Sequence, residues 1–194
     1  MKSETFPIGL RLSGRRALVV GDGAAAEQRT TALLDAGATV RVVSNRPTEG
    51  LHALGARSAI ELRERPFEDA DADECLLMVL TDLDAALAAR LDGIATARRL
   101  LFCAVDQPAH GNFSHLAVAR QGDVTVSIST NGRAPALARR LREELMRLLS
   151  DSTIAAFVDT LSALREKTPS ADRAKVLGEA VRGLRITGKL EIPE

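Results

Sequence analysis

A glycine-rich segment after an apolar run constrains this chain more than any other feature. Residues 17–20 form an apolar stretch typical of a buried strand, followed at the start of a helical pattern by Gly21-Asp22-Gly23-Ala24-Ala25-Ala26. In a G-x-G-x-x-A turn the first glycine permits the tight turn, the second lets the backbone approach a pyrophosphate, and the third small residue lets helix and strand pack closely. The segment therefore predicts a nucleotide site, with a tight turn that holds no ligand as the alternative.

Apolar runs alternate with helical patterns as far as residue 105. Strands are expected at residues 17–20, 39–43, 60–64, 76–80 and 100–105, and helices at residues 27–36 and 84–98. The stretch at 60–64 alternates apolar and polar side chains, as an edge strand does, whereas the other runs are mostly apolar. Such runs are typical of a parallel sheet covered by helices on both faces. The chain is therefore expected to have an α/β fold with an N-terminal Rossmann-type parallel sheet.

The pattern changes after residue 106. Two strands are expected at residues 116–120 and 124–129, an amphipathic helix from Pro135 to about residue 149, and two more helices separated at residues 168–170, before a polar tail that begins at Thr187. Proline is well suited to the first position of a helix. We expect a Rossmann domain at residues 1–112, a small strand–helix segment at residues 113–150 and a helical C-terminal region at residues 151–194.

Composition argues against several classes of partner. The 26 Lys and Arg residues balance the 26 Asp and Glu residues, and Trp and Tyr are absent, so nucleic acid is disfavoured. No apolar run approaches the ~20 residues that span a bilayer, and the first residues lack the apolar stretch of a signal peptide. Cys75 and Cys103 lie within apolar runs, which disfavours a disulfide framework. A cytoplasmic protein without membrane or nucleic-acid partners is expected.

Polar residues follow the second predicted strand at the edge where ligands bind in open α/β sheets. These residues are Ser44, Asn45 and Arg46, whereas NAD-binding sites often carry Asp or Glu at this place. Asn45 can bond the ribose hydroxyls, and Arg46 can meet the 2′-phosphate of NADP or simply lie in solvent. The residues alone leave the choice between NAD and NADP open.

Further candidate site residues lie at the ends of the fourth and fifth predicted strands. Thr81 and Asp82 follow the fourth strand, and Asp82 either lines the cofactor cleft or caps the next helix. Val105 and Asp106 end the fifth strand. The Asp106 carboxylate can accept a proton as hydride leaves a substrate or coordinate a metal, and the alternative is an Asx turn.

Two histidines near Asp106 raise the question of a metal site. His110 and His115 follow Asp106 at spacings that match no structural zinc pattern, and histidines in loops are seldom ligands. No permanent metal is therefore expected.

Several of these segments, in the same order, resemble the N-terminal module of siroheme synthases. The resemblance rests on residues 6–8, 18–27, 33–38, 80–84, 102–108, 112–113 and 128–142. The most specific block reads Ser-Thr-x-Gly-x-x-Pro-x-Leu-Ala-x-x-Leu-Arg from residue 129 to residue 142. The similarity is collinear from about residue 6 to residue 150 and loose beyond it.

The resemblance implies a precorrin-2 dehydrogenase, which oxidises precorrin-2 to sirohydrochlorin with NAD. In some members the same site also inserts ferrous iron or cobalt. It further implies a homodimer, with residues 113–150 as the dimerisation segment. Asp106 matches the aspartate implicated in both activities. The implied cofactor contacts are Gly21, Asp22, Gly23, Ala24, Ala25, Ser44, Asn45, Arg46, Thr81, Asp82 and Val105.

The tetrapyrrole substrate carries many carboxylates, so its pocket needs donors. The expected substrate contacts are Asn112, Phe113, Ser129, Thr130, Asn131, Gly132 and Arg133. Of Arg139, Arg140 and Arg142, one or two are expected to touch substrate and the rest to lie in solvent. Thr130 occupies a position where some relatives carry a serine that can be phosphorylated. We expect no methyltransferase module within residues 1–194. The competing hypotheses are a non-catalytic NAD-binding module and a chelatase that does not use its nucleotide fold.

Overall fold

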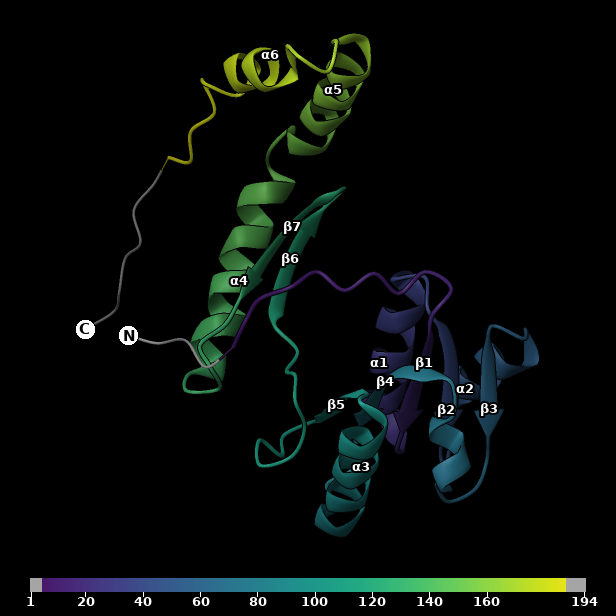
Figure 1. Cartoon of the computed structure of the whole chain (residues 1–194). Helices are drawn as coiled ribbons and strands as arrows, with labels where there is room; N and C mark the ends of the chain where they lie inside the picture. The colour runs from purple at the N-terminus through teal and green to yellow at the C-terminus, as the bar shows by residue number, and fades with distance from the viewer. Residues whose placement is uncertain (1–4, 188–194) are drawn as a thin grey trace. The chain divides into compact units, whose positions relative to one another are not determined.

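The computed structural model describes residues 5–187, and its contacts divide the chain into two compact units between His115 and Leu116. Figure 1 shows the course of the chain through both units. The expected polar tail after Thr187 lies outside the described residues.

The first unit is built on a five-stranded parallel sheet with the order β3-β2-β1-β4-β5. Its strands are β1 (Arg16–Val20), β2 (Thr39–Val43), β3 (Ile60–Arg63), β4 (Cys75–Leu80) and β5 (Leu101–Ala104). The strand order reverses at β1, where Val20 aligns with Val43 on one side and Leu80 on the other. This confirms the Rossmann-type sheet and the edge position of β3, and it places a topological switch point between the ends of β1 and β4.

Helices cover both faces of this sheet (Figure 1). The helical elements are α1 (Gly23–Asp35), α2 (Glu49–Ala56), the short 3₁₀ helix η1 (Asp69–Ala72) and α3 (Ala85–Arg98). Side chains of β1 alternate between the faces: Val19 packs in the cluster that includes Leu33 of α1, while Leu18 packs in the cluster that includes Leu91 of α3. Burial on both faces is the reason that the strands are so apolar.

Helix α2 has no counterpart among the elements expected from the sequence. Thr48 caps it by accepting a hydrogen bond from the Leu51 N–H at 3.2 Å, and Leu51 is completely buried. The helix contains Gly50 and Gly55, which weaken a helical pattern. Burial of Leu51 and the Thr48 cap outweigh this low propensity.

A buried carboxylate organises the segment between β3 and β4. Asp71 of η1 is fully buried and accepts hydrogen bonds from Arg65 at 2.7 and 2.9 Å, from the Glu68 N–H at 2.8 Å, and from Arg63. Arg41 of β2 adds a hydrogen bond of 2.6 Å to the carbonyl of Asp71. Burial alone raises the pKa of the Asp71 carboxyl, but the hydrogen bonds from Arg65, Glu68 and Arg63 outweigh it and lower that pKa below its usual 3.8.

The second unit is a hairpin with helices. Its elements are β6 (Ala117–Gln121), β7 (Val124–Ile128), α4 (Pro135–Ser150), α5 (Ile154–Lys167) and α6 (Arg173–Ala180). The two strands pair antiparallel and α4 packs on them, which confirms the expected strand–helix segment and helical C-terminal part. Among the apolar side chains of this unit up to residue 187, Ala119 and Ala138 are the ones that are buried. The unit thus has a very small core of its own.

No helix within residues 5–187 is both long enough and apolar enough to cross a membrane.

Replacing Asp71 by alanine should lower the free energy of unfolding by about 3 kcal/mol, because the half-buried Arg63 and Arg65 lose their ion pairs with a fully buried carboxylate. Asp73→Ala, two residues from Asp71, is the matched control. It removes an exposed ion pair with Arg98 and should lower the free energy of unfolding by less than about 1 kcal/mol. Urea denaturation measures both. Because folding lowers the pKa of Asp71, its stabilising effect is present above its usual pKa of 3.8 and is lost as the pH falls further. Equal losses in the two variants would contradict the assigned role.

Candidate functional site

The turn after β1 brings the backbone into very close contact with the end of β4. Gly21 has φ +135°, and its N–H donates to the carbonyl of Val43 at 3.0 Å. A Cβ atom on Gly21 would lie 2.2 Å from Thr81 Oγ1 and 2.7 Å from Asp82 Oδ1. Gly23 has φ +73°, and a Cβ there would have no neighbour within 4 Å. The first glycine is therefore required by close packing, and the second leaves open space at the start of α1.

Asp82 belongs to this turn and does not cap the next helix. Its Oδ1 accepts a hydrogen bond of 2.9 Å from the Asp22 N–H. The N-cap of α3 is Asp84, whose Oδ1 accepts from the Ala86 and Leu87 N–H groups at 3.0 Å. Of the two roles considered for Asp82, the helix cap is therefore wrong.

The carboxylate of Asp22 reaches across to the end of β2. Its Oδ1 accepts hydrogen bonds from Ser44 Oγ at 2.6 Å, from the Asn45 N–H at 2.9 Å and from the Arg46 N–H at 3.0 Å. Arg46 Nε lies 3.4 Å from the other oxygen, Oδ2. Burial alone raises the pKa of the Asp22 carboxyl, but the hydrogen bonds from Ser44, Arg46 and Asn45 outweigh it and lower that pKa. Sequence reasoning expected no acid here; the signal it missed was the acidic residue between the two glycines.

A cavity of about 370 Å³ opens beside this turn. The ends of β1, β2 and β4, the loop after β3 and the start of α3 line it, through Gly21, Ser44, Asn45, Asp82, Leu87 and other residues. Its volume and its mixture of apolar walls with a few polar groups are typical of small-molecule sites. The predicted residues of three separate strand ends thus meet at one cavity.

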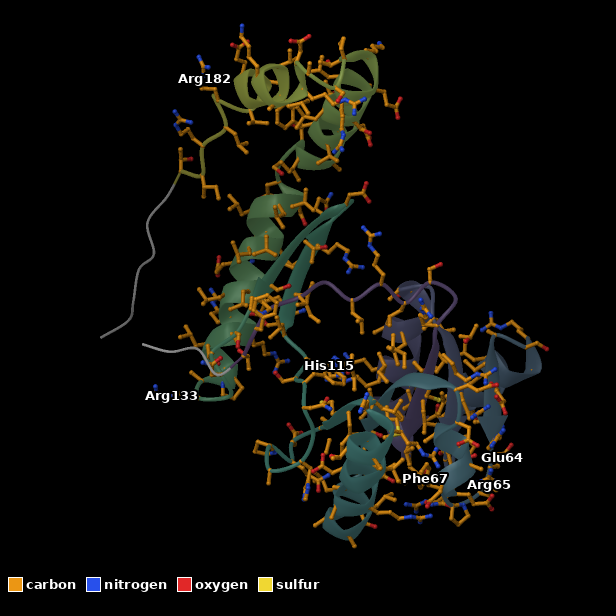
Figure 2. The ribbon with its side chains drawn as sticks, in the orientation of Figure 1. Glu64, Arg65, Phe67, His115, Arg133 and Arg182 are labelled. Carbon is orange, nitrogen blue, oxygen red and sulfur yellow. The ribbon has the colours of Figure 1, made fainter. Side chains whose placement is uncertain are left out.

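The loop after β3 contributes cavity residues that sequence reasoning missed. Arg65, Pro66 and Phe67 line the cavity together with Arg90 of α3. Figure 2 shows Arg65 and Phe67 near Glu64, beyond the end of β3. The Arg90 guanidinium lies 5.1 Å from the centre of the Phe67 ring, a cation–π contact. Nothing in the sequence pattern marks this loop, since its course depends on the ion pairs around Asp71.

Asp106 stands at the carboxyl end of β5, outside the lining of that cavity. It is exposed and has φ +58°, a left-handed conformation that is uncommon for a residue with a side chain. Its neighbours on both sides are tied to β4 and the segment after it: the Val105 N–H donates to the Leu80 carbonyl and Gln107 Nε2 to the Asp82 carbonyl, each at 2.9 Å. The backbone of Asp106 is thus fixed next to Asp82.

Asn112 and Phe113 have structural contacts in the first unit. The Asn112 side chain accepts from the Phe102 N–H and donates to the Leu100 carbonyl, both at 2.9 Å. The half-buried Phe113 packs against the core cluster on the α1 side of the sheet, with its ring edge-to-face with His115 at 5.3 Å. Substrate contacts by these two residues stay predictions.

The remaining predicted substrate residues form one turn in the second unit. This turn joins β7 to α4, and Asn131 and Gly132 have φ +50° and +73° in it. The Asn131 N–H donates to Ser129 Oγ at 3.1 Å, and the Arg133 N–H donates to the Thr130 carbonyl at 3.0 Å. Figure 2 shows Arg133 at the start of α4.

Among residues 5–187, no three or more His, Cys, Asp and Glu side chains are placed so that they could hold a metal ion. His110 instead lies 3.8 Å from Asp92, between Nδ1 and Oδ2.

The chain matches two family models. Residues 8–117 match a family described as putative NAD(P)-binding, and residues 121–148 match the sirohaem biosynthesis protein central domain. It is also 37% identical over 161 residues to the siroheme synthase of Thioalkalivibrio sulfidiphilus and 35% identical over 147 residues to that of Neisseria meningitidis serogroup C. These alignments cover 83% and 76% of this chain but 32% and 31% of the relatives. The chain spans about a third of the length of these curated relatives.

A solved structure named SirC, precorrin-2 dehydrogenase, has the same fold. It superposes with a TM-score of 0.74 at 22% sequence identity, over 91% of this chain and 89% of that one.

Gly21→Ala should weaken dinucleotide binding at least tenfold and lower the free energy of unfolding by about 2 kcal/mol, since the added methyl clashes with Thr81 and the backbone is left-handed. Titration with NAD⁺ and urea denaturation measure the two effects. Gly93→Ala is the control, because Gly93 lies exposed within α3 with open space around it. This variant should raise the free energy of unfolding by about 0.5–1 kcal/mol. Wild-type affinity in a folded Gly21→Ala protein would refute the assigned role of the turn.

Proposed function

We propose that this chain, which belongs to the family of putative NAD(P)-binding domains found in siroheme synthases, is a precorrin-2 dehydrogenase. It oxidises precorrin-2 to sirohydrochlorin with NAD⁺ as the hydride acceptor. One observation carries the proposal: an intact dinucleotide turn and a segment that matches the sirohaem central domain stand in the same chain. The likeness to a solved protein named precorrin-2 dehydrogenase supports it.

The start of α1 is suited to hold the pyrophosphate. Asp22 occupies the N-cap position, but its carboxylate makes no capping hydrogen bond to the helix. The Asp22 carboxylate therefore leaves the first N–H groups of α1 uncapped, and the space beside Gly23 is open. Free N–H groups at a helix start favour a bound anion such as a pyrophosphate. The cavity lined by Ser44, Asn45 and Phe67 then takes the adenosine part.

Asp106 is the proposed proton acceptor. Bound NAD⁺ supplies the hydride acceptor, so oxidation of the macrocycle releases one proton to a base. The exposed carboxylate of Asp106 stands at the carboxyl end of β5, the edge at which ligands bind in such sheets, on a backbone held by Val105 and Gln107.

Substrate carboxylates are proposed to bind at the turn between β7 and α4. Among residues 5–187, no carboxylate pairs with Arg133, so its charge is available. In contrast, Arg139 and Arg142 lie 3.7 and 3.9 Å from Glu143, and Arg140 pairs with Glu143 and Glu144. The helix arginines thus share two glutamates, whereas Arg133 has no such partner, which supports Arg133 as a donor to a substrate carboxylate.

The second unit is proposed to be completed by another copy of the chain. It buries little apolar surface, while Val118 of β6 and Leu137 and Leu148 of α4 stay exposed. A two-stranded hairpin with so small a core is marginal alone. We also propose a cytoplasmic location, which agrees with two buried cysteines that form no disulfide.

Anaerobic incubation with enzymatically generated precorrin-2 and NAD⁺ tests the function directly, with sirohydrochlorin followed by absorbance. Turnover is expected with NAD⁺. No turnover with either NAD⁺ or NADP⁺, while a dinucleotide still binds, would favour the non-catalytic module instead. The chelation implied by the resemblance stays a separate prediction, tested by adding ferrous or cobaltous ion to sirohydrochlorin with and without the protein.

Asp106→Asn should lower kcat at least a hundredfold, because the amide cannot accept the proton. NAD⁺ binding and the free energy of unfolding should stay at wild-type values, since the side chain is exposed. Asp35→Asn, at the far end of α1, is the matched loss of one exposed carboxylate and should leave kcat unchanged. Wild-type turnover by Asp106→Asn would remove Asp106 from the mechanism.

Light scattering after size exclusion should give twice the 20.7 kDa mass of one chain at micromolar concentration. A single-chain mass across a dilution series starting at tens of micromolar would contradict the proposed dimer.

A further inference from the structure

We propose that Asp22 makes this site select NAD over NADP, by placing at the end of β2 the carboxylate that the strand itself lacks. The inference rests on the proposed function and deepens it, since it names the residue that distinguishes the two dinucleotides. In Rossmann sites an acid after the second strand binds the ribose 2′-hydroxyl, whereas a nearby arginine favours the 2′-phosphate of NADP. Here Ser44, Asn45 and Arg46 follow β2, so the strand offers an arginine and no acid.

The carboxylate comes instead from the glycine-rich turn. Asp22 Oδ1 lies 2.6 Å from Ser44 Oγ and within 3.0 Å of the N–H groups of Asn45 and Arg46. Ser44 and Asn45 both line the cavity beside the turn. The side chain of Asp22 is 19% exposed, so it is held in place but still open to a ligand. Its carboxylate thus lies beside the residues that follow β2, the region from which the usual acid comes.

The two carboxylate oxygens have different partners. Oδ1 accepts three hydrogen bonds and is saturated. Within residues 5–187, the one polar contact of Oδ2 is the Arg46 Nε at 3.4 Å, which is long for a hydrogen bond. Oδ2 therefore keeps acceptor capacity for a ribose hydroxyl. The backbone N–H groups of Asn45 and Arg46 are already used by Asp22, so they are not available to a 2′-phosphate.

The negative charge of Asp22 also favours NAD over NADP. A 2′-phosphate at this place would lie beside the ionised carboxylate, and juxtaposed like charges are strongly unfavourable. Arg46 is the cation nearest to Asp22, but its guanidinium pairs with Asp22, and its side chain is 88% exposed. The cavity-lining Arg65 and Arg90 are paired with Asp71 and Asp69. The site therefore repels NADP in addition to accepting NAD, and both effects contribute to selectivity.

The competing interpretation is that Asp22 only ties the turn to β2. In that case removing its charge weakens both dinucleotides equally, and their affinity ratio does not change. The ratio of dissociation constants for NAD⁺ and NADP⁺ is thus the quantity that separates selectivity from a structural role.

Isothermal titration calorimetry with NAD⁺ and with NADP⁺ tests the inference without precorrin-2. Wild-type protein should bind NAD⁺ at least tenfold more tightly than NADP⁺. Asp22→Asn keeps the size of the side chain and removes its charge, and it should tighten NADP⁺ binding about tenfold while weakening NAD⁺ a few-fold. Adding Arg46→Ala to that variant should reduce the gain for NADP⁺ without abolishing it, because the freed guanidinium provides one part of the gain and the lost repulsion provides the other.

Glu64→Gln is the matched control. It removes one exposed carboxylate beyond the end of β3, outside the cavity lining, and should leave the affinity ratio unchanged. Equal affinities in the wild type, an unchanged ratio in Asp22→Asn, or the same change in Glu64→Gln would each overturn the inference. If NAD⁺ binds and precorrin-2 is oxidised, such a result leaves the proposed function intact. If neither dinucleotide binds the wild-type protein, the proposed function and this inference both fail.

Discussion

The direct packing of the end of β1 against the end of β4 is the contact on which the candidate site depends. Gly21 has no side chain, so Thr81 and Asp82 approach its backbone, and Asp82 accepts a hydrogen bond from the Asp22 N–H. That bond orients Asp22, whose carboxylate in turn binds the backbone after β2. Two aspartates thus join three strand ends into one wall, and the cavity opens beside it. A side chain at residue 21 would disturb all of these contacts together.

Much of the fold could be predicted because burial on both faces leaves a clear pattern in the sequence. The strand expected at residues 39–43 coincides with β2, and the edge position of β3 was visible in its alternating side chains. Helix α2 escaped prediction because Gly50 and Gly55 dilute its pattern. Its existence depends on the burial of Leu51, a tertiary effect that no local pattern reports.

The candidate site could be predicted where backbone geometry demands a residue type, and less well where side chains meet over long distances. The turn and Asp82 are local features of strand ends, and both lie at the cavity. The loop that carries Arg65 and Phe67 could not be predicted, since it follows the ion pairs of Asp71. The contact of Asp22 with β2 joins residues more than twenty positions apart, so its role became visible only in the structure.

The Asp22 side chain bonds the residues after β2 and leaves the start of α1 without a capping hydrogen bond from its N-cap residue. A capping aspartate commonly stabilises a helix start by about 1 kcal/mol, yet here the N-cap residue makes no such bond. The start of α1 is therefore less stable than a capped one, and its first N–H groups are not used by the Asp22 carboxylate. A ligand with acceptor atoms can bond the uncapped N–H groups and so stabilise the start of α1. Part of its binding free energy then comes from the added stability of this helix. Occupancy of the site and rigidity of α1 are in this way thermodynamically linked.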